Sequence, residues 1–557
     1  MDLIARVRAH TMAAGIVFLI VTTILLYAPM FDAAFKSMDD MFLIVHNQDI
    51  REISQVPDLL RQPLFKEKVY YRPLVSLSYM LEYQVFGLNP LPFHLSNIFI
   101  HVATALLVWR IVFMILADLK LSYAVSLLFA IHPIQWEAVS NISGRAILLC
   151  AFFVLLSFCF YIRSPRNKWS YFFSLISFGL ALMAKESAVV LPLVLAGYQF
   201  LIKETKPSAF RSWLPVVPYF IVLGMYMILR VYMGIVEVFY WESVREAVLA
   251  FVTFLRSVIT YGRLFVFPVG LVYDRSMPIL SGGMDGQLWA TFLFYGISAG
   301  LLFRCRKKIP KVIMFSVCWV WLFLIPVAQV FFSLIVRPGY ILMAEHFVYL
   351  SSVGVFILMA LGVQRLDIFC QRKGLISQKG FWIFIVGMFV FFGLMTLQQN
   401  LYSSNEVALY EASLKRNPWN QRLRHVLTSV YYKAAKFSLS EGHLRQLLIH
   451  DPQDKRARIN LGRVLCEQGR YQEGIEEYKK ITAPGYFGRV LNWHIAAAYE
   501  GCGQWGPAAK YYEKMLIPAL VDDENMIAAR RLAEIYDRLG EKEKAARYRW
   551  LFESNIR

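Results

Sequence analysis

Charged residues make up only 17% of this 557-residue chain, whereas soluble domains contain about 25%. The shortage is uneven, because long uncharged apolar runs continue to about Leu397 and then stop. Runs of that length exclude an ordinary soluble protein and predict membrane helices. We therefore expect an all-α chain with a polytopic membrane domain at residues 1–398 and a polar domain at residues 399–557.

Cysteine is also scarce, with seven residues and no C-x-x-C pair. Three of them, Cys150, Cys159 and Cys318, lie inside apolar runs, so neither a disulfide framework nor a zinc or redox site is expected. The net charge of +19 would suggest nucleic acid in a soluble protein. Much of this excess lies in short loops between apolar runs, where membrane topology explains it, so no nucleic-acid partner is expected.

About eleven apolar runs are long enough to suggest membrane spans. They lie near residues 11–31, 92–116, 123–134, 146–161, 171–183, 189–201, 214–231, 288–302, 312–331, 347–363 and 381–397. Cations gather in alternate loops, which puts the N-terminus in the cytoplasm and the polar domain outside it. The run at residues 247–267 carries Arg256 and Arg263, and a full span there would invert this pattern. We interpret it as an interfacial or re-entrant helix.

The polar domain contains a sequence repeat. Asn417-Pro418 and Asp451-Pro452 are 34 residues apart, and Ala435, Gly469 and Gly503 recur at the same interval. This is the spacing of tetratricopeptide repeats, which are helix-turn-helix units that bury a core only when three or more stack. About four repeats fit, and such surfaces commonly bind peptides or proteins.

Two adjacent carboxylates, Asp39 and Asp40, follow the first apolar run. A positioned carboxylate can remove the proton of an attacking hydroxyl. Adjacent carboxylates also repel one another, which favours binding of a proton or a divalent cation. The pair therefore predicts a catalytic base, with a metal site as an open possibility. A solvated loop pair is the alternative.

The next polar cluster precedes and enters the second run. Arg72, in Tyr70-Tyr71-Arg72-Pro73, could donate two hydrogen bonds to a phosphate. His94, Asn97 and His101 follow at helical spacing on one face, and they should point into the bundle. Hydrogen bonding between helices is the alternative role for this face.

Further polar residues lie at the same predicted side of the membrane. They are His132, Glu137, Arg145, Lys185, Glu186, Asp274, Arg275, Arg337, Glu345 and His346. Cations gathered there could stabilise a departing phosphate, although each residue alone is commonly an interfacial anchor. We predict that side chains from several hairpins form one site.

These motifs, in this order, resemble the transmembrane and tetratricopeptide-repeat-containing O-mannosyltransferases, which have the glycosyltransferase type C fold. The stretches that carry the resemblance are Asp39-Asp40, Tyr71 to Leu74, Phe93 to His101, His132 to Val139 with Ser143 to Arg145, Ala184 to Glu186, and Ala344 to Gly354. The repeats come last, as in that family.

The resemblance implies an inverting enzyme of a plasma or inner membrane that moves mannose or another hexose from a polyprenyl-phosphate carrier to Ser or Thr of an extracytoplasmic protein. It implies that Asp39 and Asp40 are catalytic, with Asp39 favoured as the base. Where the family commonly has Arg, this chain has His346, so phosphate contact there becomes pH-dependent or falls to Arg337. The small number of repeats favours a bacterial or archaeal relative.

Two other functions stay open at this point. The same architecture could glycosylate a lipid or polysaccharide, in which case glycan would be found on lipid and on no protein. The chain could also be a non-enzymatic scaffold that uses its repeats, in which case replacing Asp39 and Asp40 would leave its function intact.

Overall fold

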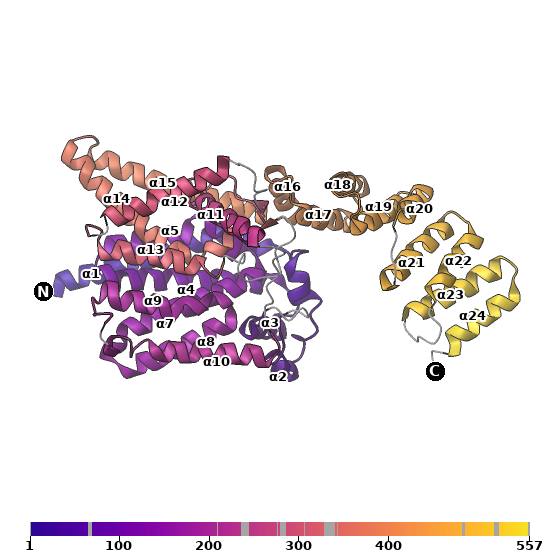
Figure 1. Cartoon of the computed structure of the whole chain (residues 1–557), viewed down its shortest axis with the longest axis horizontal. Coiled ribbons are helices and arrows are strands. Elements are labelled where there is room, and N and C mark those ends of the chain that lie inside the picture. Colours follow the sequence, from indigo (N-terminus) through magenta and orange to yellow (C-terminus); the bar gives the residue numbers. More distant parts are fainter. Residues whose placement is uncertain are drawn as a thin grey trace. The chain divides into compact units, whose positions relative to one another are not determined.

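The computed structural model describes residues 2–64, 70–208, 210–235, 244–275, 277–278, 286–305, 307–327, 340–341, 343–481, 485–516 and 523–554 (Figure 1). It divides into two compact units, Met1–Asn417 and Pro418–Arg557. The fold is helical in both, as predicted, apart from one antiparallel pair of two-residue strands, β1 (Met277–Pro278) and β2 (Tyr340–Ile341).

The first unit is a helical bundle in which α4, α7, α8 and α10 run side by side (Figure 1). Its helices are α1 (Asp2–Tyr27), α2 (Val56–Leu59), α3 (Pro73–Phe86), α4 (Pro90–Leu116), α5 (Leu119–Ile131), α6 (Trp136–Ser140), α7 (Arg145–Arg163), α8 (Lys168–Ala184), α9 (Leu191–Gly197), α10 (Val217–Tyr232), α11 (Val244–Val266), α12 (Gly286–Cys305), α13 (Lys311–Leu324), α14 (Ser351–Lys373), α15 (Gln378–Ser403) and α16 (Glu406–Arg416).

Five apolar segments are long enough to cross a membrane: Met12–Asp32, Pro90–Leu116, Ile142–Arg163, Ser351–Lys373 and Gln378–Ser403. They confirm that the chain is a membrane protein. Six shorter apolar helices coincide with the other predicted runs, so every run contains a helix and the number of complete spans stays a prediction. Helix α11 is not among the apolar candidates in the described residues. Its interfacial placement also stays a prediction.

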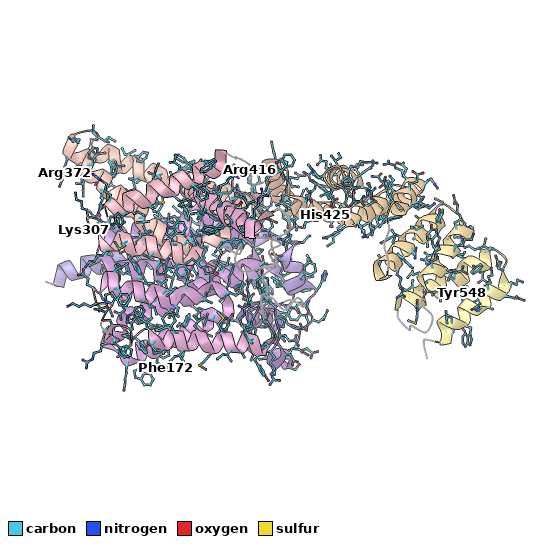
Figure 2. The ribbon with its side chains drawn as sticks, in the orientation of Figure 1. Phe172, Lys307, Arg372, Arg416, His425 and Tyr548 are labelled. Carbon is cyan, nitrogen blue, oxygen red and sulfur yellow. The ribbon has the colours of Figure 1, made fainter. Side chains whose placement is uncertain are left out.

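Two of the loop cations used to orient the chain, Lys307 and Arg372, are labelled in Figure 2. Lys307 and Arg372 are at one end of the bundle, and Arg416 lies toward the other (Figure 2). The chain alternates between these ends because short connections join antiparallel helices. The end that follows α1, α5 and α8 and precedes α14 therefore collects the residues predicted to form the site.

Helix α16 belongs to the first unit, so the unit boundary lies beyond the one expected at residue 398. The side chains of α16 hold other parts of that unit. Ser413 Oγ accepts a hydrogen bond from Tyr273 N at 3.0 Å, and Arg416 donates to the Leu271 carbonyl at 2.7 Å. The polar composition of α16 concealed this packing from the sequence analysis.

The second unit consists of helix pairs: α17 (Gln421–Lys433) with α18 (Phe437–His450), α19 (Lys455–Glu467) with α20 (Tyr471–Lys479), α21 (Gly485–Gly501) with α22 (Trp505–Met515), and α23 (Asp523–Arg538) with α24 (Lys542–Ser554). Ala435, Gly469, Gly503 and Gly540 all have positive φ in the turns within the pairs. Glycine suits this left-handed position. The repeated small residues therefore mark the predicted turns.

Candidate active site

The acidic pair lies in the turn after α1, where the backbone fixes Asp40. Its Oδ2 accepts a hydrogen bond from Lys36 N at 2.9 Å, and its Oδ1 accepts one from Ser143 N at 3.2 Å. Burial raises the pKa of Asp40 to about 6, against the opposing effect of the Lys36 hydrogen bond and charge. Asp39 beside it is only partly buried. Asp40 therefore anchors the turn, and Asp39 is the more accessible carboxylate.

Lys36 is a site residue that the sequence analysis missed. It is 4% exposed, and its ammonium donates hydrogen bonds to Asn141 Oδ1 and, at 2.7 Å, to Ser403 Oγ. Burial lowers its pKa to about 8, while the charge of Asp40 opposes the shift. One signal was available: Lys36 is the only Lys or Arg between Phe31 and Ile50. It joins the acidic turn to the end of α15.

A second clamp on the turn comes from α16. Glu406 accepts hydrogen bonds from Ser37 through both carboxylate oxygens: from the backbone N–H to Oε1, and from Oγ to Oε2 at 3.0 Å. Glu406 thus connects the acidic turn to α16, the helix that follows the last apolar helix. Nothing in the sequence distinguished Glu406 from an ordinary first-turn acid of a helix.

Glu137 and His346 form a pair from distant hairpins. His346 Nδ1 lies 3.1 Å from Glu137 Oε1, and His346 N donates to Glu137 Oε2 at 3.0 Å. Burial raises the pKa of Glu137, but the charge and hydrogen bonds of His346 outweigh it, so the pKa lies below its usual range. The carboxylate is 3% exposed and the imidazole 28%. His346 therefore stays accessible while Glu137 orients it.

Glu345 has different partners from the adjacent His346. Its Oε1 accepts hydrogen bonds from Arg275 at 2.6 Å and from Val272 N at 3.2 Å. The side chain is fully buried, and burial raises its pKa to about 7 against the charge of Arg275. Glu345 thus holds the segment around Arg275 in place and has no access to a substrate in this structure.

Arg72 and Glu186 form a two-pronged ion pair, with N–O distances of 3.2 and 2.8 Å. The guanidinium also lies over the Tyr70 ring, 4.3 Å from its centroid. From the sequence, Arg72 was expected at the entry to the second span. Instead, Pro73 starts the separate helix α3 directly after it. Glu186 already accepts two hydrogen bonds from the Arg72 guanidinium, which leaves fewer of its N–H groups for a phosphate.

Lys185 has a different environment from the other cations of the site. Its ammonium lies 5.4 Å from the centroid of Phe347, and in the described part of the chain it has no ion pair or hydrogen bond. Lys185 lines a small cavity together with Cys150, His346 and Phe347. Burial lowers its pKa to about 7, with the charge of Arg72 acting in the same direction. Lys185 is thus the cation best placed to receive an anion.

Arg145 is buried and already occupied. It pairs with Glu82 at 2.7 and 3.2 Å, donates to Asn97 Oδ1 at 2.5 Å and donates to the Phe93 carbonyl at 2.9 Å. These bonds hold the start of α7 against α3 and α4. We therefore assign Arg145 a positioning role in place of the predicted phosphate contact. Glu82 was missed because a single acid on a short apolar helix gave no signal.

The polar face of α4 points into the bundle as predicted, with His94, Asn97 and His101 all fully buried. Asn97 donates to the Asn141 carbonyl at 2.8 Å, and His101 Nδ1 lies 2.7 Å from Tyr349 Oη. Both make the hydrogen bonds between segments that the alternative reading expected. His94 faces the backbone of Ala33 and Ala34, just before the acidic turn.

His132 also has a structural position. Its Nδ1 accepts a hydrogen bond from Ile134 N at 3.2 Å, and its Nε2 lies 3.0 Å from the Phe265 carbonyl. Burial lowers its pKa to about 3, so the ring is neutral. The predicted Arg337 lies outside the described residues.

The structure gathers most of the predicted residues at one end of the bundle. Asp40, Glu406 and Glu137 all act electrostatically on Lys36, and Glu137, Glu186 and Arg72 all act on Lys185. Glu137 is common to both sets. The acidic turn and the cationic cavity are therefore neighbouring parts of one charged site.

The divalent cation considered for the acidic pair from the sequence stays a prediction. No group of three His, Cys, Asp or Glu side chains in the described segments could hold a metal ion. Both Oδ atoms of Asp40 already accept backbone hydrogen bonds. No step is therefore assigned to a metal.

Comparisons with known proteins bear on both units. A family model for tetratricopeptide repeats matches residues 428–486, which confirms the predicted repeats. Two solved structures of MamA are also similar; one has a TM-score of 0.25 and 17% identity, covering 27% of this chain and 80% of MamA.

Protein O-mannosyl-transferase TMTC3 of Homo sapiens is 26% identical over 490 residues, which cover 79% of this chain and 52% of that protein. The Drosophila melanogaster Tmtc3 is 24% identical over 82% of this chain and 58% of its own length. TMTC2 of Homo sapiens is 33% identical over 25% of this chain and 18% of its own length. The chain spans about half the length of the TMTC3 relatives. These matches confirm the resemblance: the chain is similar to transmembrane and tetratricopeptide-repeat-containing O-mannosyltransferases over about four fifths of its length.

Proposed function

We propose that this chain transfers mannose or another hexose from a polyprenyl-phosphate carrier to Ser or Thr of a protein outside the cytoplasm, with inversion at the sugar. The observation that carries the proposal is the fixed acidic turn together with a cavity lined by Lys185, whose ammonium has no ion-pair partner among the described residues. A hydroxyl nucleophile needs a base, and a phosphate leaving group needs a cation. This end of the bundle supplies both.

Asp39 acts as the base. It takes the acceptor hydroxyl proton as the oxygen attacks the anomeric carbon, typically accelerating such a step by about 10²–10⁴-fold. Asp40 keeps the turn in place through its two backbone hydrogen bonds. Lys36 balances the charge of Asp40 inside the protein. The bond from the anomeric carbon to the phosphate oxygen breaks with its electrons going to the phosphate.

Lys185 and His346 stabilise the departing polyprenyl phosphate. Both side chains line the same cavity, and Glu137 holds His346 in place through their 3.1 Å contact. Positioned charges that face developing negative charge are commonly the largest contribution to such catalysis. Arg72 joins them if the phosphate displaces part of its pairing with Glu186.

The repeats present the acceptor protein. The TMTC relatives are named as protein O-mannosyl-transferases, which favours a protein acceptor over a lipid or polysaccharide. Tetratricopeptide arrays provide an extended surface for a peptide or protein. The proposed orientation places the acidic turn and the repeats outside the cytoplasm, in keeping with the cation-rich loops at the opposite end of the bundle.

Intact-mass glycoproteomics of the extracytoplasmic fraction tests this function. It would compare the native host, a deletion strain, and the deletion complemented with wild type or with the Asp39→Asn/Asp40→Asn double variant. We expect a hexose mass to disappear on deletion and to return only with wild type, at equal expression. A glycoproteome that is unchanged on deletion would refute protein glycosylation. Glycolipid analysis of the same strains would then separate a lipid acceptor from a scaffold role.

A further inference from the structure

A second cavity lies at the end of the bundle opposite the charged site. It has a volume of about 660 Å³ and is bounded by α1, α5, α14 and α15. Most of its lining is apolar, including Leu19, Leu127, Ile385 and Phe389. Its volume is within the range of about 300–1,000 Å³ found for small-ligand pockets.

The position of the cavity along its helices defines a membrane leaflet. It involves the first half of the apolar segment Met12–Asp32, the first ten residues of α5, residues 360–368 of α14 and the first half of α15. From Asp118 to Leu128 the lining covers ten residue steps, about 15 Å of helix. That is half of a hydrocarbon core of about 30 Å. The cavity therefore matches the depth of one leaflet, on the side away from the acidic turn.

Polar groups line only one end of this cavity. The charged lining residues are Asp118, Lys120 and Asp367, and they stand where α5 starts and α14 approaches its end. Trp382, 46% exposed, lines the cavity within the first turns of α15. Tryptophan favours the membrane–water interface. This end therefore lies at headgroup level, with the apolar remainder in hydrocarbon.

The charges at that end select a kind of headgroup. Two carboxylates and one ammonium would repel a purely anionic headgroup and would complement one that carries both an amine and a phosphate. Lys120 is exposed and, within the described chain, makes no ion pair or hydrogen bond through its ammonium. Asp118 and Asp367 each use one oxygen, Asp118 for Leu121 N at 3.0 Å and Asp367 for Gln371 Nε2 at 3.3 Å.

We propose that this cavity binds a membrane phospholipid of the phosphatidylethanolamine class. One acyl chain lies between α5 and α15, the phosphate faces Lys120, and the amine faces Asp118 and Asp367. The lipid occupies the cavity between the apolar side chains of these helices. This site is independent of the proposed transferase reaction.

The test uses the purified full chain after delipidation in detergent, with native mass spectrometry and thermal unfolding as readouts. Dioleoyl-phosphatidylethanolamine should remain bound and raise the unfolding temperature. Dioleoyl-phosphatidylglycerol and dioleoyl-phosphatidylcholine, which lack a primary amine, should bind at least several-fold more weakly. Ala124→Phe fills the cavity and should abolish both effects. Val386→Phe, on the lipid-exposed side of α15 and outside the cavity, is the matched control and should retain them.

Asp367→Asn keeps the cavity open and should reduce the preference for the amine headgroup. The proposal is overturned if folded Ala124→Phe retains phosphatidylethanolamine as wild type does. Equal binding of all three phospholipids, or preferential retention of undecaprenyl phosphate, also overturns it. Should Ala124→Phe fail to fold, a photoactivatable acyl-chain phosphatidylethanolamine decides the question: crosslinks to α5 or α15 lining residues support the site, and crosslinks only elsewhere refute it.

Discussion

Lys185 and Arg145 resemble each other in the sequence as candidate phosphate ligands, yet their surroundings predict opposite consequences of replacement. Arg145 is 1% exposed and bridges Glu82, Asn97 and the Phe93 carbonyl. Lys185 lines a cavity, and no charged side chain among the described residues forms an ion pair with its ammonium. Replacing each by Met separates folding from binding of the sugar donor.

The cost of Arg145→Met follows from what it leaves behind. Removing one partner of a buried ion pair destabilises by about 3–5 kcal/mol, since the other charge stays buried without compensation. Here Glu82, which is 13% exposed, would be left unpaired, so the cost should lie toward the lower end of that range, and Asn97 Oδ1 would lose its donor. We expect a large fall in thermal stability. The double variant Glu82→Gln/Arg145→Met removes both charges and should recover part of it.

Lys185→Met should weaken binding of the sugar donor. A hydrogen bond from a charged group contributes about 1.5–3 kcal/mol, and each 1.4 kcal/mol is about tenfold in affinity. Binding of polyprenyl-phosphate mannose should therefore weaken about 10- to 100-fold with the fold intact. Lys185→Arg keeps the charge and should restore most of the affinity.

The assay pairs thermal unfolding of the purified chain with direct binding of radiolabelled polyprenyl-phosphate mannose. The reasoning is refuted if Arg145→Met is as stable as wild type but binds the sugar donor poorly. It is equally refuted if Lys185→Met binds the sugar donor normally. Either result would mean that the contacts seen around these two cations do not determine their roles.

Four further outcomes follow from the same contacts. Asp39→Asn should lower turnover about 10²–10⁴-fold without changing thermal stability, whereas Asp40→Asn loses a backbone acceptor and should cost about 1–3 kcal/mol in unfolding free energy. Because the pKa of Lys185 is lowered to about 7, its charge is lost as pH rises through that value; sugar-donor affinity should fall there in wild type and stay flat in Lys185→Arg. Glu406→Gln keeps one acceptor for Ser37 and should be milder than Glu406→Ala in both turnover and protease resistance of the turn. Truncation after Asn417 should keep sugar-donor binding, and truncation at residue 398 should abolish it.

The helical pattern could be read from the sequence because it depends on local composition. Long uncharged runs located the apolar helices, and the interval of 34 residues located the turns at Ala435, Gly469 and Gly503, all of which have positive φ. The roles of polar residues could be read less well. His101, Asn97 and Arg145 have the composition of a binding site but form hydrogen bonds between helices, because a buried polar group must find a partner wherever it lies.

What the sequence could not supply was pairing between distant segments. Lys36 contacts Ser403 and Asn141, which lie 367 and 105 residues away. No periodicity connects such positions, and the polarity of the segment after residue 398 assigned it to the repeats. Contacts of this kind depend on how the bundle closes, which single-sequence patterns do not encode.

The two truncated fragments differ by residues 399–417, which comprise the end of α15 and all of α16. Cutting at residue 398 removes Ser403 and Glu406, and with them a partner of the buried Lys36 ammonium and both acceptors of Ser37. Cutting after Asn417 keeps these bonds and removes only the second unit. If the repeats present the acceptor, the longer fragment should bind polyprenyl-phosphate mannose as the full chain does but transfer little sugar to protein. Sugar-donor binding by the shorter fragment at wild-type affinity would show that α16 does not support the acidic turn, and that the boundary inferred from composition is the functional one.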